Sequence, residues 1–77
     1  MSKEFILPDL GEGVESAKIV DLLVKVGEKF EEDQVVLEVE TDKATVEVPS
    51  DEAGTVEEVL VEKGSDVKVG TVVFRYK

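Results

Sequence analysis

The sequence predicts an all-β domain, a flattened barrel or sandwich of two antiparallel sheets related by a pseudo-two-fold axis. Three observations predict this fold class: short Val-rich runs separated by glycine-containing turns, a hairpin pattern at mid-chain, and an internal repeat. With 77 residues, 42% of them apolar, the chain has the size of a single small domain covering residues 1–77.

The hairpin pattern lies on both sides of Asp42-Lys43. Apolar and polar residues alternate before and after this pair, and a period of two predicts two strands that each have one apolar face. The apolar positions are Val35, Leu37 and Val39, then Ala44, Val46 and Val48; Val36, Glu38 and Glu40 fall on the opposite, largely acidic face. Asp-Lys is not a pair that favours a type I′ turn, so we expect a type I turn over Thr41 to Ala44.

The other elements are shorter. Phe5-Ile6-Leu7, closed by Pro8, has the character of an edge strand. Ala17 to Val26 is strand-like, with a break in its period that predicts a bulge near Asp21. A turn at 27–29 and a short connection at 30–34 lead into the hairpin.

The second half of the chain repeats the first at a shift of 37 positions, without a gap over more than twenty residues. The shift superimposes Ile19 on Val56, Leu22 on Val59, Gly27 on Gly64, Leu37 on Phe74 and Val39 on Tyr76. We therefore expect half-repeats of about 3–41 and 44–77, joined by the Asp42-Lys43 turn. Symmetry then places both termini at the end opposite Lys43.

One loop departs from this symmetry. If Pro8 and Pro49 are equivalent, the register slips by four upstream, which predicts a four-residue insertion at Gly11-Glu12-Gly13.

Composition restricts the classes of function. The net charge of −10 repels nucleic acid and anionic membranes, and it favours a soluble monomer. No apolar run approaches the ~20 residues of a membrane span, and nothing resembles a signal peptide.

The side chains also restrict the chemistry. The chain has no Cys and no His, so thiol nucleophiles, imidazole bases and Cys/His zinc sites are excluded. Its carboxylate pairs read as a solvated face, and they lack EF-hand spacing, although a Ca²⁺ site of clustered carboxylates stays open as an alternative. We expect no catalytic site and no metal.

Lys43 is the remaining candidate. It lies at the centre of the repeat, on a turn that two strands hold in place, with acidic residues around it. A lysine at a turn is most often only a solubilising charge. The central position favours a second interpretation, in which Lys43 is a substrate for another enzyme.

The residues around Lys43 resemble the modification motif of lipoyl domains, which belong to the acyltransferase component of 2-oxo acid dehydrogenase complexes. The motif runs through Glu40-Thr41-Asp42-Lys43-Ala44 and Val46 to Ser50, and the resemblance extends to Leu7 to Gly13 and to Gly27 and Gly54. It covers essentially the whole chain.

The resemblance implies a non-catalytic carrier. Lys43 would bear lipoate in amide linkage, as a swinging arm that a thiamin-diphosphate decarboxylase reductively acylates. The acyltransferase core would pass the acyl group to coenzyme A, and dihydrolipoamide dehydrogenase, a flavoprotein, would reoxidise the dithiol. Pyruvate is the first expectation among the 2-oxo acids. Such complexes lie in the bacterial cytoplasm or the mitochondrial matrix.

The resemblance also suggests recognition residues. Glu40, Thr41, Asp42 and Ala44 would shape recognition by the lipoate-attaching enzyme. The loop of Gly11, Glu12, Gly13 and Val14 would lie near the lysine and help the decarboxylase select its carrier, with a plain surface loop as the alternative.

Three rival interpretations stay open. A biotin carrier domain shares the fold but flanks its lysine with methionines, whereas Asp42 and Ala44 stand here. The glycine-cleavage carrier protein is longer and lacks the Pro8-Asp9-Leu10-Gly11 start. An unmodified acidic β-module that only binds proteins is the rival from another class.

Overall fold

Two four-stranded antiparallel sheets form the domain, as the sequence predicts. A computed structural model describes residues 2–77, and its longest dimension is 33 Å. One sheet has the order β1-β8-β6-β3 and the other the order β5-β4-β2-β7. The strands are β1 (Lys3–Ile6), β2 (Ser16–Leu22), β3 (Lys29–Phe30), β4 (Val35–Glu40), β5 (Thr45–Pro49), β6 (Gly54–Val59), β7 (Asp66–Lys68) and β8 (Val72–Tyr76).

The core lies between the sheets and consists of aliphatic and aromatic side chains. Phe74 is fully buried, stacks on Phe5 with a centroid distance of 4.7 Å, and meets Phe30 edge-on at 5.6 Å. Fully buried aliphatic residues from both halves complete it, including Leu7, Ile19, Val36, Leu37, Val39 and Val73. Packing of this kind lets a small domain remain stable without disulfides.

Strand pairing in the second half reproduces that in the first at the 37-residue shift. Ile19 pairs with Val39 and Asp21 with Glu38, while Val56 pairs with Tyr76 and Glu58 with Arg75. Both pairs of strands shift register at the same place, between Ile19 and Asp21 and between Val56 and Glu58. The bulge expected near Asp21 is confirmed.

The turns repeat as well. Glu28 N–H donates to Lys25 O at 2.9 Å, and its counterpart Ser65 N–H donates to Glu62 O at 3.1 Å. Each turn also bonds to the opposite half, because Gly27 N–H donates to Val56 O and Gly64 N–H to Ile19 O. The halves are therefore interlocked.

The pairing changes the expected size of the loop insertion. Leu7 bonds to Gly70 and Thr71 as Ser50 bonds to Asp33 and Gln34, so Leu7 is equivalent to Ser50, a shift of 43 positions. The difference between 43 and 37 means that the loop between β1 and β2, the long first-half connection, is six residues longer than the equivalent loop between β5 and β6. The sequence predicted a difference of four residues. The prediction of four residues was wrong because it treated Pro8 and Pro49 as equivalent. Pro49 lies within β5, whereas Pro8 follows β1.

Three further details differ from expectation. Val36 is buried instead of lying on the acidic face, since the β4–β5 register shifts between Val35 and Leu37 and turns consecutive residues inward. The strand beginning near Ala17 ends at Leu22, four residues before Val26. Part of the connection at 30–34 is strand, because Phe30 ends β3.

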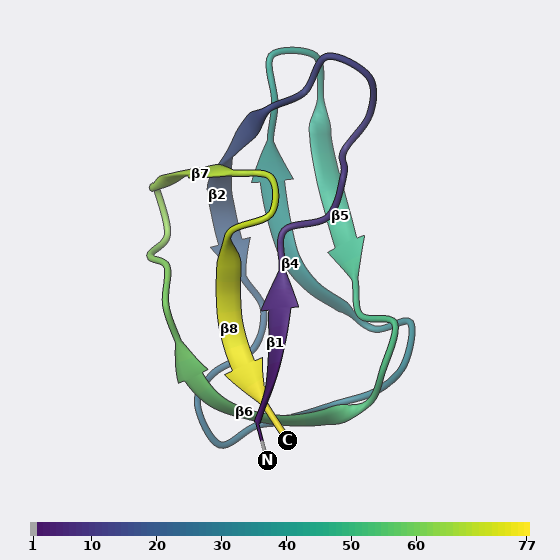
Figure 1. Ribbon diagram of the computed structural model, residues 1–77, viewed down its shortest axis with the longest axis vertical. Helices are drawn as coiled ribbons and strands as arrows, with labels where there is room; N and C mark the ends of the chain where they lie inside the picture. Colours follow the sequence, from purple (N-terminus) through teal and green to yellow (C-terminus); the bar gives the residue numbers. More distant parts are fainter. Residues whose placement is uncertain (1) are drawn as a thin grey trace.

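The two ends of the domain differ. The β4–β5 hairpin and the long first-half connection lie together at one end, while β1 begins and β8 ends at the other (Figure 1). The side chains of Lys3 and Tyr76 both bond to Glu52 near the terminal end, at 2.9 and 2.8 Å. The expected separation of the termini from Lys43 is confirmed.

Candidate functional site

Lys43 lies on the hairpin of β4 and β5, whose ladder of paired residues is longer than the β2–β4 and β2–β7 ladders of the same sheet. β4 and β5 pair from Val35–Pro49 to Glu40–Thr45, and Thr41 N–H extends the ladder by donating to Ala44 O at 2.8 Å. Inward residues lose burial towards the tip: Val48 is buried, Val46 half-buried and Ala44 exposed. Asp42 and Lys43 thus project beyond the core into solvent.

The turn itself is organised by the hydroxyl of Thr41. Thr41 Oγ1 donates to Ala44 O at 3.0 Å and accepts the backbone N–H groups of Lys43 and Ala44, each at 3.2 Å. Neither Asp42 nor Lys43 has a positive φ, which agrees with a type I turn and excludes type I′. The side chain supplies the acceptor for Ala44 N–H, a local bond typical of Ser and Thr in turns.

The long connection between β1 and β2, residues 8–15, lies beside the hairpin turn and forms the other side of the site. Leu10 packs against the core, and Asp9 Oδ1 accepts Gly11 N–H at 3.0 Å. Val14 N–H donates to Gly11 O at 3.2 Å, and the turn between them places Gly13 at a φ of 81°, where glycine is favoured. The extra residues therefore form an ordered turn directed at the hairpin end.

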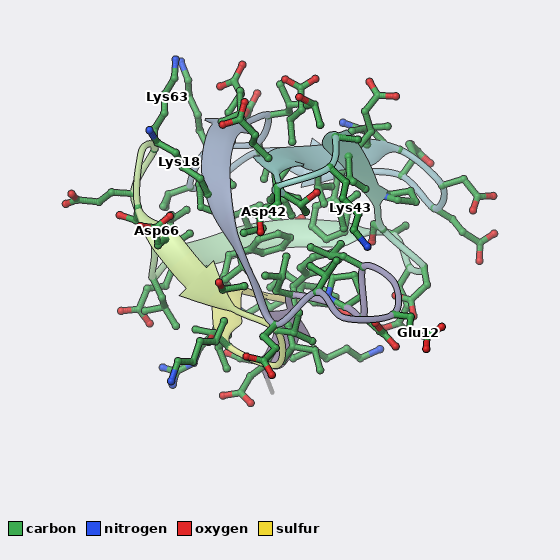
Figure 2. All side chains as sticks on the ribbon, turned by 90° about the horizontal axis from the view of Figure 1, so that it is seen from above. Glu12, Lys18, Asp42, Lys43, Lys63 and Asp66 are labelled. Atoms are coloured by element: carbon green, nitrogen blue, oxygen red, sulfur yellow. The ribbon has the colours of Figure 1, made fainter. Side chains whose placement is uncertain are left out.

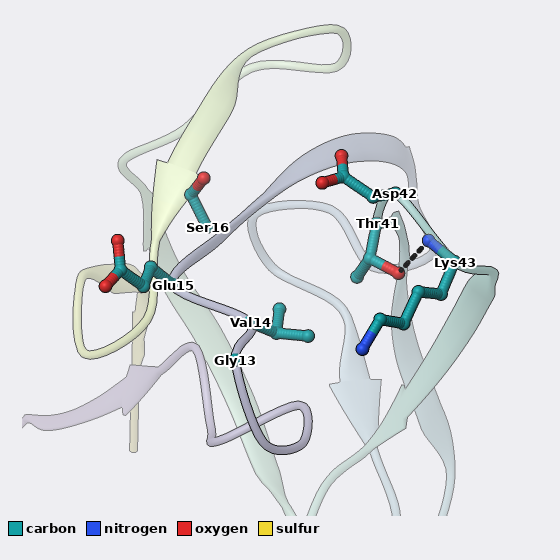
Figure 3. Close-up of a pocket in the computed structure, with 7 residues that line it drawn as sticks. All are labelled: Gly13, Val14, Glu15, Ser16, Thr41, Asp42 and Lys43. Carbon is teal, nitrogen blue, oxygen red and sulfur yellow. Dashed lines mark hydrogen bonds between the residues drawn. The ribbon is translucent and has the colours of Figure 1, made fainter.

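Hairpin and connection enclose a cleft of about 210 Å³. Its lining residues are Gly13, Val14, Glu15, Ser16, Thr41, Asp42 and Lys43 (Figure 3). The Lys43 side chain extends towards Val14, whereas the Asp42 carboxylate points to the other side of the turn. Val14 is half-buried.

The structure brings some of the expected site residues together and leaves others apart. Gly13, Val14, Thr41 and Asp42 share the cleft with Lys43. Gly11, Glu12, Glu40 and Ala44 are exposed nearby but do not line it. Glu15 and Ser16 line it although sequence reasoning missed them. Glu15 ends the long connection and Ser16 begins β2, and this junction between loop and strand was the available signal.

The Lys43 amine forms no ion pair with any of residues 2–77. The ion pairs found among residues 2–77 all involve Lys3, Arg75 or Lys77, which lie on β1 and at the end of the chain. Seen onto the hairpin end, Lys43 lies beside the long connection, with Glu12 beyond it, while Lys18 and Lys63 project from the opposite side (Figure 2). The Lys43 side chain is exposed, so its amine is accessible from solvent.

Perturbed ionisable groups lie away from this end. A hydrogen bond from Lys3 and a second from Tyr76 lower the pKa of Glu52. Burial, together with the hydrogen bond to Glu52, raises the pKa of Tyr76 to about 12. Within the described residues, no cluster of three or more Asp or Glu side chains has the geometry to hold a metal ion, and no helix is suited to crossing a membrane.

A doubled β domain with an exposed lysine on the hairpin that joins its halves is typical of one class, the domains that carry a covalently attached cofactor. Comparison with known sequences assigns the family: the biotin/lipoyl family, described as "Biotin-requiring enzyme", matches residues 3–76. The chain belongs to this family, and within it is a lipoyl domain.

Individual relatives agree with that assignment. The dihydrolipoyllysine-residue acetyltransferase component of the pyruvate dehydrogenase complex of Staphylococcus aureus (strain N315) is 51% identical over 75 residues, which are 97% of this chain. The protein of the same name from Staphylococcus epidermidis (strain ATCC 12228) is 49% identical over the same length. The chain spans 17% of the length of these relatives.

A solved structure shares the fold. The lipoyl domain of the 2-oxoglutarate dehydrogenase complex from Azotobacter vinelandii matches with a TM-score of 0.75, covering 96% of this chain and 94% of that one at 23% identity. The resemblance that the sequence indicated, and the fold class, are both confirmed.

Proposed function

We propose that Lys43 is the lipoyl attachment site and that the domain carries acyl groups between active sites of a 2-oxo acid dehydrogenase complex. The observation that carries this proposal is the position of Lys43: it is exposed, makes no ion pair with residues 2–77, and lies on the β4–β5 hairpin at the end of the domain opposite the termini. The amine fits amide formation with lipoate, since no neighbouring group has to be displaced first.

Amide-linked lipoate would supply a dithiolane that accepts an acyl group and two electrons. The chain's own residues contribute presentation. The hairpin holds the attachment point in one orientation, which reduces the ordering entropy that a partner enzyme must overcome. The domain needs no catalytic residue, so we propose a non-catalytic carrier.

The partners we propose follow from that role. A lipoate-attaching enzyme modifies Lys43, a thiamin-diphosphate decarboxylase acylates the arm, the acyltransferase core transfers the acyl group to coenzyme A, and dihydrolipoamide dehydrogenase restores the disulfide. Pyruvate is the substrate we propose, supported by the names of the staphylococcal relatives. Nucleic acid and membranes are not partners, and the isolated domain is a monomer. The bacterial relatives make a cytoplasmic complex the expected setting.

Recognition is divided between the two walls of the site. Glu40, Thr41, Asp42 and Ala44 are proposed to contact or present the lysine to the attaching enzyme. Gly11, Glu12, Gly13 and Val14 are proposed to contact the decarboxylase, supported by the position of Gly13 and Val14 beside Lys43. All belong to a single domain, residues 1–77, whose half-repeats of about 3–41 and 44–77 meet at the Asp42-Lys43 turn.

Intact mass tests the attachment site. In a host that lipoylates proteins, the wild-type domain should gain one lipoyl group, and Lys43→Ala should gain none. Lys63→Ala is the matched control, because Lys63 is also an exposed lysine on a turn and should leave modification unchanged. The lipoylated domain should then be reductively acylated faster by the thiamin-diphosphate decarboxylase component of a pyruvate dehydrogenase complex than by that of a 2-oxoglutarate dehydrogenase complex.

Two results would contradict the proposal. Addition of biotin to the wild-type chain would favour a biotin carrier. A wild-type chain that stays unmodified in lipoate-replete cells would favour the protein-binding module.

A further inference from the structure

Thr41 makes more hydrogen bonds in the hairpin turn than either residue at its tip. A hydroxyl has one donor and two acceptor positions, and all three are used here within one turn. The proton goes to Ala44 O, and the two acceptor positions receive Lys43 N–H and Ala44 N–H. A single oxygen atom therefore holds the backbone on both sides of the lysine's side chain.

Asp42 does not share this task. The structure gives its carboxylate no hydrogen bond and no ion pair within residues 2–77, and the side chain points away from Lys43. The aspartate of the neighbouring loop behaves differently, because Asp9 Oδ1 accepts the N–H of Gly11. The conformation of the lysine turn thus depends on the residue two positions before the lysine.

Neither glycine nor side-chain packing fixes the conformation of this turn. Residues 41–44 include no glycine, and neither central residue has the positive φ of the tight hairpin turns. Asp42, Lys43 and Ala44 are all exposed, so no contact with the core holds them. Without the hydroxyl, Ala44 N–H and Lys43 N–H would turn to water and the tip would sample several conformations.

We propose that the Thr41 hydroxyl is a positioning group for lipoylation, acting through the backbone of Lys43 and not by contact with the attaching enzyme. This inference rests on the proposed function of Lys43. A tip that is competent for only part of the time raises the apparent KM by the inverse of the competent fraction and leaves kcat unchanged. Loss of the three hydrogen bonds of the Thr41 hydroxyl should raise the apparent KM about fivefold, the effect expected for the net contribution of one typical hydrogen bond.

The test compares Thr41→Val, which keeps the shape and loses the hydroxyl, with Thr41→Ser, which keeps the hydroxyl. A lipoate–protein ligase with free lipoate and ATP should show a KM about fivefold higher for Thr41→Val, with kcat preserved, and a nearly normal KM for Thr41→Ser. Amide hydrogen exchange on the unmodified variants gives a second readout. Lys43 and Ala44 N–H should exchange faster in Thr41→Val, whereas Asp42→Asn should leave both rates unchanged, with equal urea midpoints showing that the fold is intact.

Each outcome decides the matter. Equal KM values for the wild type and Thr41→Val would overturn the positioning role while leaving Lys43 as the attachment site. Equal defects in the Ser and Val variants would assign the effect to contact with the ligase. A wild-type domain that takes no lipoate would remove both proposals.

Discussion

Gly54→Ala is expected to destabilise the domain, because this glycine lies where two strands and the C-terminus meet. An added Cβ would be 2.7 Å from Lys77 O, 2.7 Å from Tyr76 Cδ2 and 3.2 Å from Phe30 Cζ. The first two separations are shorter than any ordinary van der Waals contact, and one involves backbone. Lys77 is held there by paired hydrogen bonds with Thr55, both 3.0 Å long.

The magnitude follows from two opposing effects. Replacing glycine by alanine in a strand would by itself stabilise by about 0.5–1 kcal/mol, through lost freedom in the unfolded chain. Forced overpacking costs about 1–3 kcal/mol. We expect the clash to win, with a net loss of about 1–2 kcal/mol, which for a domain of this size lowers Tm by roughly 4–16 °C.

The other half of the chain supplies a matched control. The equivalent of Gly54 is Ala17, which pairs with Val67, whereas Gly54 pairs with Phe30. A smaller partner relieves the 3.2 Å contact with Phe30 and leaves the 2.7 Å separation from Lys77 O, so Gly54→Ala should cost somewhat less, but still destabilise, in a Phe30→Val background. Thermal and urea unfolding followed by circular dichroism measure both effects; the chain has no Trp to follow by fluorescence. A Gly54→Ala variant as stable as the wild type would refute the steric argument.

Two further predictions concern backbone conformation and pH. Gly70 has a φ of 93°, and its repeat equivalent Asp33 has a φ of 70°, so this turn position accepts aspartate in the other half of the chain. Gly70→Ala should therefore lower the free energy of unfolding by about 1–2 kcal/mol and Gly70→Asp by less, as measured by urea unfolding. Equal losses for the two variants would contradict the explanation. Because the pKa of Tyr76 is raised to about 12, its contribution is complete below pH 10 and is lost as the pH rises from 10 to 12. Unfolding free energies should fall over that range in the wild type and fall less in Tyr76→Phe, and identical slopes would show that another group controls the alkaline limit.

Sequence patterns predicted the parts of the fold that depend on local periodicity. Alternation identified the hairpin around Asp42-Lys43, a broken period located the bulge near Asp21, and the spacing of Gly27 and Gly64 located equivalent turns. The first two signals are carried by residues close together in the chain, and the third is a repeat at constant spacing, so none of them requires knowledge of which strands pair.

Features that depend on pairing between distant residues were not predictable in the same way. The loop before β2 is six residues longer than the equivalent loop before β6, and this follows from the hydrogen bonds of Leu7 to Gly70 and Thr71. The positions of the prolines in the sequence do not indicate these bonds. The burial of Val36 follows from a register shift against β5. Thr41 was recognisable as a turn residue, but the three bonds of its hydroxyl depend on the hairpin having this geometry.

The interlocking of the halves has a consequence for how small such a domain can be. Each sheet takes strands from both half-repeats, so neither half contains a complete sheet. A polypeptide of half this length could satisfy the same ladders only as two copies wound around each other. The present chain covalently joins such a pair, and the junction between the two copies is the loop that displays the lysine.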